Sequence, residues 1–138
     1  MRKSTKKLVV DIIKDYPNIQ QRINERIEYI KHPNFKPDNN VGGGRPKYKN
    51  NNWIEHVVIT INDDECLHTL EKEKNVIDEC LTNTGRDTEI IIRESIMNNR
   101  SITELITKGK IFCGVTRAYK LREQFIKEVA KGLGIDKL

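Results

Sequence analysis

Apolar residues recur three or four positions apart through most of this chain, a spacing typical of helices that bury one face. The pattern runs over residues 8–13 and resumes over residues 19–30. Pro17 lies between the two runs, and a proline ends a helix, kinks it or begins a new one. We therefore predict a helical hairpin or a kinked helix over residues 4–31, and take the hairpin as the N-terminal element of the fold.

A second periodic region covers residues 53–82. From Asp64 onward its pattern is clearly helical, whereas residues 56–61 are rich in β-branched side chains and could form a strand in isolation. No second segment offers a convincing strand to pair with, so we predict one long middle helix ending near residues 83–85, and an all-α fold. The apolar stripe of this helix consists of Leu67, Leu70, Ile77 and Leu81.

Residues 32–52, between these regions, break every periodicity. They contain three prolines, three consecutive glycines and six asparagines, which favour turns and irregular backbone. One interpretation is a plain linker, and the other is a basic arm in which Arg45, Lys47 and Lys49 contact a DNA backbone. The chain then divides into four segments: an N-terminal helical region (1–31), the linker (32–52), the middle helix (53–85) and a C-terminal unit (86–138).

The C-terminal unit has the most specific order of elements. Asp87 or Thr88 can cap a helix that is followed by a turn at residues 98–100. Ser101, with Glu104 three residues later, matches a capping box at the start of a short helix. This short helix, a tight link and a long basic helix give the order of a helix-turn-helix unit.

The short helix is predicted over residues 102–107, the link around Gly109, and the basic helix from about Val115. In a helix-turn-helix unit, the first turns of the second helix enter the major groove of DNA. The net charge of +5 and the pI near 9.1 also favour an anionic partner. The residues predicted to contact DNA are Thr116, Arg117, Tyr119 and Lys120, with Lys127 on the same face and with Lys108 and Lys110 holding phosphates from the link.

Three residues of this unit fit the helix-turn-helix interpretation less well. Glu123 lies on the presumed DNA face, where a carboxylate is unfavourable unless it pairs with a cation or accepts from a cytosine amine. Arg122 lies near the buried stripe, so we predict that it pairs with a carboxylate inside the protein. Leu105 stands where the commonest helix-turn-helix pattern has a small residue. The alternative to a DNA-binding helix is therefore a helix that packs against the rest of the protein and whose basic face is only solvated.

Several segments resemble, in the same order, those of one family, the phage transcriptional regulators of the RinA/ArpU type. The resemblance covers nearly the whole chain. The matching pieces are Asp15-Tyr16-Pro17, the linker series from Asn40 to Arg45, the middle series Leu70-Glu71, Ile77, Glu79, Cys80 and Leu81, and the C-terminal series from Thr116 to Leu121 followed by Phe125, Ala130, Leu133, Gly134 and Ile135.

This resemblance implies an all-helical protein whose C-terminal helix-turn-helix is similar to region 4 of sigma factors. It also implies activation of phage late genes, including packaging and morphogenesis operons, in Gram-positive bacteria. Residues 115–122 then correspond to the recognition helix. The link at residues 108–113 departs from the usual pattern of the family, which bears on the register of that helix.

Other chemistry has little support in the sequence. Cys66 and His68 are the only close pair of zinc-ligand types, and two positions apart on a helix they point to different faces. We predict no metal, no cofactor and no enzyme activity. Three widely spaced cysteines and no apolar run long enough to span a membrane favour a cytoplasmic protein with reduced thiols.

Our main expectation is a sequence-specific activator that binds double-stranded DNA of a phage late operon, with a homodimer and contact to host RNA polymerase as further expectations. The alternative is a protein-interaction module that binds RNA polymerase and makes no base-specific contacts with DNA. A weaker alternative is a protein similar to a small terminase subunit, which also carries a helix-turn-helix.

Overall fold

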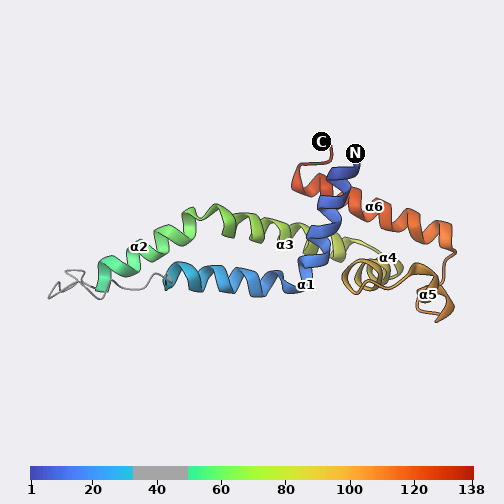
Figure 1. Ribbon diagram of the computed structural model, residues 1–138, viewed down its shortest axis with the longest axis horizontal. Helices are drawn as coiled ribbons and strands as arrows, with labels where there is room; N and C mark the ends of the chain where they lie inside the picture. Colours follow the sequence, from blue (N-terminus) through green and yellow to red (C-terminus); the bar gives the residue numbers. More distant parts are fainter. Residues whose placement is uncertain (33–49) are drawn as a thin grey trace. The chain divides into compact units, whose positions relative to one another are not determined.

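The computed structural model describes residues 1–32 and 50–138, apart from the side chains of residues 50–54 and 59. Over these residues the chain forms helices and no strand (Figure 1). In chain order the elements are α1 (Lys3–Lys31), α2 (Asn50–Asp63), α3 (Glu65–Asn83), α4 (Arg86–Ile91), the π-helical η1 (Ile92–Met97), α5 (Ile102–Thr107) and α6 (Val115–Leu133). The predicted all-α class is confirmed.

Helix α1 continues through Pro17, so of the two predictions for residues 4–31 the N-terminal hairpin is wrong and a single helix is present. Proline lacks the N–H that would bond to the carbonyl of Ile13 in a regular helix. Apolar side chains are buried on both sides of it, with Val9 and Ile13 before and Ile19 and Ile23 after. Because both flanking turns are held by burial, the loss of one hydrogen bond does not end the helix.

The predicted long middle helix is in fact two helices, because the pattern is interrupted at Asp64. Arg26 donates to the Asp64 carboxylate from Nε at 2.7 Å and from Nη2 at 3.1 Å. These bonds lower the pKa of Asp64 against the opposing effect of burial, and the backbone N–H groups of Cys66 and Leu67 add to the lowering. A carboxylate that accepts from the first N–H groups of a helix acts as its N-cap, so Asp64 begins α3. Residues 56–61, the candidate strand, are helical as predicted.

Contacts divide the chain into two compact units. The first unit combines Met1–Gln20 with Lys72–Leu138, and the second is Gln21–Glu71. The boundaries of these two units do not coincide with those of the four segments that we predicted along the sequence. It brings the start of the chain to its C-terminal half, a long-range association that periodicity alone does not reveal.

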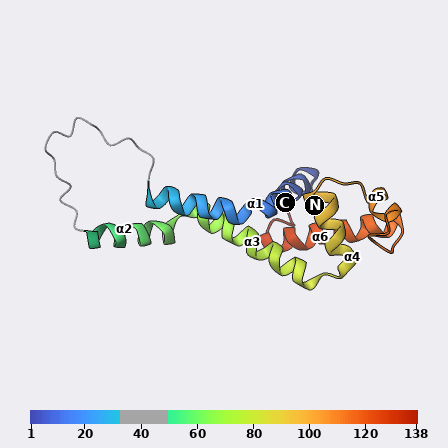
Figure 2. The same cartoon turned by 90° about the horizontal axis from the view of Figure 1, so that it is seen from below.

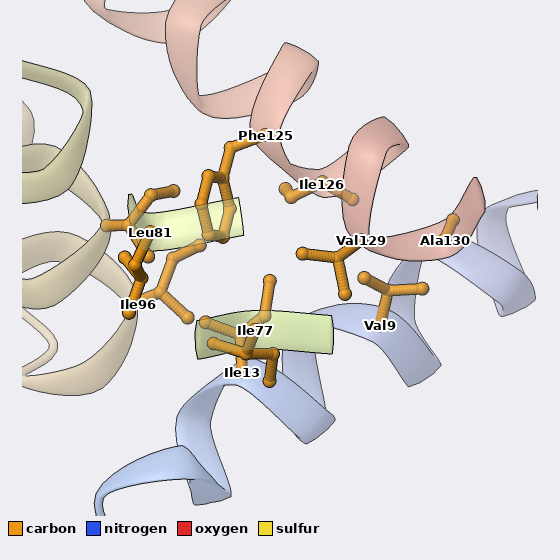
Figure 3. Packing of buried hydrophobic residues seen from close by; sticks show 10 residues of the cluster. Val9, Ile13, Ile77, Leu81, Ile96, Phe125, Ile126, Val129 and Ala130 are labelled. Carbon is orange, nitrogen blue, oxygen red and sulfur yellow. The ribbon is translucent and has the colours of Figure 1, made fainter. Parts of the chain in front are cut away.

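The main core of the first unit is formed by side chains from α1, α3, η1 and α6 (Figure 3). Phe125 and Ile126 of α6 point toward Ile13 of α1 and Ile77 of α3 in this view. Each such side chain, when fully buried, stabilises the fold by roughly 1.5–3 kcal/mol. The buried members are Val9, Ile13, Ile77, Leu81, Ile92, Ile96, Phe125, Ile126, Val129 and Ala130.

The two ends of the chain also meet in the first unit, and they lie close together in both views (Figures 1 and 2). The backbone N–H of Arg2 donates to the carbonyl of Leu138 at 3.2 Å. The hydroxyl of Thr5 donates to the same carbonyl at 3.3 Å. The start of α1 is thereby tied to the chain that follows α6.

The segment formed by α4 and η1 joins two clusters of buried residues. Ile91 belongs to a second cluster with α5 and α6, whereas Ile92 belongs to the main core. The segment begins after Gly85, which makes no side-chain cap, so the predicted caps at Asp87 or Thr88 are wrong. The predicted turn after it is present, with Asn99 in the left-handed region at φ 57°.

The described residues of the second unit bury few apolar side chains. They are Ile23, Val57 and Leu67. The Arg26–Asp64 pair described above supplements them, and the Arg26 guanidinium also lies 5.1 Å from the ring centre of Tyr29. A cation over an aromatic face is attracted by the ring, so Arg26 links two kinds of contact in this unit.

Candidate nucleic-acid interface

Both ends of the short helix α5 are fixed by sequence-encoded caps. The N–H of Glu104 donates to the hydroxyl of Ser101 at 3.1 Å, which confirms Ser101 as the N-cap. The Glu104 carboxylate does not complete the capping box and instead pairs with Lys108 at 2.7 Å. At the other end, Gly109 is left-handed with φ 69°, a conformation that glycine adopts without strain.

The hydrogen bonds around Gly109 define the link between α5 and α6. The N–H of Gly109 donates to the carbonyl of Ile106 at 3.0 Å, and the N–H of Lys110 donates to that of Leu105 at 2.9 Å. This pair of bonds is the Schellman arrangement that closes a helix and turns the chain away. The predicted tight link around Gly109 is therefore present.

The second cluster of buried residues sets α6 against α5. Leu105 of α5, Ile111 of the link and Ala118 of α6 are each no more than 2% exposed and belong to this cluster together. The large residue at position 105, which looked unfavourable in the sequence, is accommodated here because α6 contributes the small side chain of Ala118. The N-terminal half of α6 is thus held by α4, α5 and the link.

The predicted contact residues of α6 lie on its exposed side, and all but Lys127 belong to its N-terminal half. Thr116, Arg117, Tyr119, Lys120 and Lys127 are all exposed. All of them except Arg117 line one shallow hollow on the surface, together with Val115, Glu123 and Gln124. Arg117 lies in the same N-terminal turns but outside the hollow.

The cations at this site differ in whether an acidic side chain pairs with them. Arg117, Lys120 and Lys127 form no ion pair with the described residues, whereas Lys108 pairs with Glu104 at 2.7 Å. Lys110 lies 3.8 Å from the Glu94 carboxylate. Surface pairs of this kind contribute only about 0–1 kcal/mol, so both lysines can exchange these partners for a phosphate.

Glu123, the main objection to a DNA-binding face, has a partner from a distant part of the sequence. The ammonium of Lys6 in α1 donates to its carboxylate at 2.5 Å. Both side chains remain partly exposed, at 43% and 38%. The negative charge on this face is therefore matched by a cation that sequence spacing could not have indicated.

The prediction for Arg122 is wrong. Its Nε is buried and has no hydrogen-bond partner among the described residues. Among the described residues, Oε2 of Glu94 is likewise buried without a hydrogen bond, although Arg100 and Lys110 lie within ion-pair distance of it. Arg122 is half-buried beside the apolar face of α6, as its position near the stripe indicated, but no carboxylate meets its Nε.

One exposed residue at this site was missed by the sequence analysis. Phe112, in the link before α6, is 87% exposed. The neighbouring Ile111 is buried, and two adjacent apolar residues give no periodic signal of which one faces the solvent. The linker residues Arg45, Lys47 and Lys49, predicted to contact a DNA backbone, lie outside the described residues.

Within residues 1–32 and 50–138, no three His, Cys, Asp or Glu side chains come together as a metal site. Over the same parts of the chain, no helix is long and apolar enough to cross a membrane.

The fold and the site define an all-helical protein in which a short capped helix and a tight glycine link present an exposed basic helix. The chain belongs to the family described as protein of unknown function DUF722, whose model matches residues 3–131. That match includes all the predicted contact residues of α6 and of the link before it. No curated protein and no solved structure matches the chain.

Proposed function

We propose that this protein is a sequence-specific regulator of transcription that binds double-stranded DNA through the N-terminal half of α6. The observation that carries the proposal is the exposure of Thr116, Arg117 and Lys120 on a helix end whose opposite side is buried against α4 and α5. Arg can pair with guanine through two hydrogen bonds, and Thr and Lys can reach bases or phosphates. Because the opposite side of the helix packs against α4 and α5, these groups can meet one DNA sequence better than others.

The charge of this face supports the same conclusion. Arg117, Lys120 and Lys127 are exposed and have no acidic partner among the described residues, while Glu123 is matched by Lys6. Cations that have no partner in the protein gain most from a phosphate backbone, and the counterions they release make such binding depend steeply on salt. Lys108 and Lys110 flank the face from the link and supply further phosphate contacts.

The biological role in the proposal comes from the resemblance to the RinA/ArpU-type regulators. We propose activation of phage late genes, such as packaging and morphogenesis operons, in the cytoplasm of a bacterial host. Host RNA polymerase would be the second partner, and a homodimer would allow two half-sites to be bound.

The experiment is a selection of duplexes from a random pool with the full chain, followed by gel shifts of the selected and a scrambled duplex at two salt concentrations. DNA from just upstream of the packaging and morphogenesis genes in its own phage is included. The proposal expects a clear preference for the selected duplex and much weaker binding at the higher salt. Equal binding to both duplexes, or no binding, would contradict it.

A second candidate is a module that binds RNA polymerase without base-specific contacts. The observation that favours it is the exposed apolar surface at the same end of α6, where Phe112 is 87% exposed. Retention of purified polymerase by the immobilised chain at high salt, with no gel shift of any duplex, would support this candidate over the first.

A further inference from the structure

Three apolar side chains are exposed at the N-terminal end of α6. Phe112 in the link is 87% exposed, Val115 at the start of the helix is 45% exposed, and Tyr119 one turn later is 47% exposed. Single exposed apolar residues are common on protein surfaces. Three at one helix end, beside the face already assigned to DNA, suggest a common role.

The position of Phe112 follows from its neighbour. Ile111 is only 2% exposed and anchors the link in the second cluster, so the next side chain is turned to the solvent. Val115 and Tyr119 are four residues apart and therefore share a face of α6. They line the shallow hollow together with Thr116 and Lys120.

Cations lie at the same end of α6, and the carboxylate of Glu123 in the hollow is paired with Lys6. Lys120 lies in the same hollow, Arg117 is exposed in the first turns of α6, and Lys110 precedes Phe112 by two residues in the link. A protein partner with a matching apolar patch would have to be acidic as well. Duplex DNA supplies both features at once, because its major groove combines phosphates at the rim with the C5-methyl group of thymine on the floor.

We propose that Phe112, together with Val115 and Tyr119, contacts thymine methyl groups in the major groove, so that this protein selects sites by their thymines as well as by guanine contacts. The inference rests on the proposed DNA-binding function and adds the base that the apolar residues recognise. Uracil lacks this methyl group, so the same residues would also discriminate against a duplex in which thymine is replaced by uracil.

The test is fluorescence anisotropy with the selected duplex and with the same duplex carrying uracil at individual thymine positions. The full-length wild-type chain is compared with Phe112→Ala and with Leu8→Ala, which removes another exposed apolar side chain (52%) from α1. Loss of one methyl contact corresponds to an affinity about fourfold lower at each contacted thymine. Circular dichroism checks that Phe112→Ala keeps its helices, as expected for so exposed a side chain.

The inference expects the wild type and Leu8→Ala to lose affinity on uracil substitution, and Phe112→Ala to bind the thymine duplex more weakly and to show a smaller uracil penalty. If the wild type prefers the selected duplex but binds its thymine and uracil forms equally, the inference is overturned while the proposed function stands. An undiminished uracil penalty in Phe112→Ala also overturns it. If no duplex is preferred at all, the inference and the proposed function both fail. Loss of polymerase binding in Phe112→Ala would then assign the apolar residues to a protein partner.

Discussion

The ammonium of Lys6 lies 2.5 Å from a carboxylate oxygen of Glu123 and joins the start of α1 to the basic helix α6. The two residues are 117 positions apart in the sequence. Lys6 thereby balances the negative charge of Glu123 on the face that we assign to DNA. The N-terminal helix thus contributes to the electrostatics of a surface formed mainly by the C-terminal unit.

Replacing Lys6 by Ala should weaken DNA binding, because Glu123 would then face the phosphates without a partner. We expect a loss of about two- to fivefold, in line with the small value of partly exposed ion pairs. Lys7→Ala removes the same charge from an exposed position nearby and should have a smaller effect. The double variant K6A/E123Q, which keeps the net charge, should restore affinity in a filter-binding titration. An equal loss in K6A and K7A would show that the ion pair has no specific role.

Gly109 should tolerate substitution poorly, since its φ of 69° lies in the left-handed region. Alanine in that region costs about 1 kcal/mol, so Gly109→Ala should lower the free energy of unfolding by that amount. No neighbouring atom lies within 4 Å of an added Cβ, so the cost is one of backbone conformation and not of steric overlap. Gly109→Asn should lower the free energy of unfolding by less, because asparagine adopts this backbone region more readily. Urea unfolding measures both, and equal stability of Gly109→Ala and wild type would contradict the Schellman assignment.

Gly132 of α6 approaches α3 closely. A Cβ added there would lie 2.7 Å from Cγ1 of Val76, closer than two carbon atoms normally come. Alanine is intrinsically better than glycine in a helix by about 0.8–1.0 kcal/mol, so two effects oppose one another. In a thermodynamic cycle, Gly132→Ala should be more favourable in a Val76→Ala background than in the wild type, by at least about 0.5 kcal/mol. Additive effects would indicate that α3 and α6 are not in contact at this point.

Stability should fall at high pH because of Tyr16. Burial, followed by its hydrogen bond to Asp78, raises the pKa of Tyr16 from 10.0 to about 12. The unfolded chain loses this proton near pH 10 and the folded chain only near pH 12, so the contribution is fully present below pH 10 and is lost as the pH rises toward 12. Thermal unfolding from pH 9 to 12 should show a steeper loss for the wild type than for Tyr16→Phe. Parallel curves for the two proteins would rule out a perturbed Tyr16.

Local features of the fold were predictable from the sequence. The helical class follows from apolar spacing, and the short helix with Ser101 as its cap and Gly109 at its end follows from residues whose conformational preferences are strong. The exposure of Thr116, Arg117 and Lys120 follows from the phase of α6. These predictions depend on neighbours within one or two turns.

Features that depend on distant residues were not predictable. The break at Asp64 is accompanied by a pair with Arg26, which lies 38 positions earlier, and α1 continues through Pro17 with buried side chains on both sides. The missing partner of Arg122 and the exposure of Phe112 are likewise set by how helices meet. The spacing of polar and apolar residues in one segment carries no information about such contacts.

The central claim is that the N-terminal half of α6 recognises a DNA sequence. Its most direct test is the affinity of the variant R117A/K120A for the selected and the scrambled duplex, measured by anisotropy, with K7A/K14A as a control of equal charge loss on exposed positions of α1. We predict that R117A/K120A binds both duplexes with the same weak affinity and keeps its helical content, while K7A/K14A still prefers the selected duplex. A preference for the selected duplex that survives in R117A/K120A would contradict the assignment of α6 as the recognition helix.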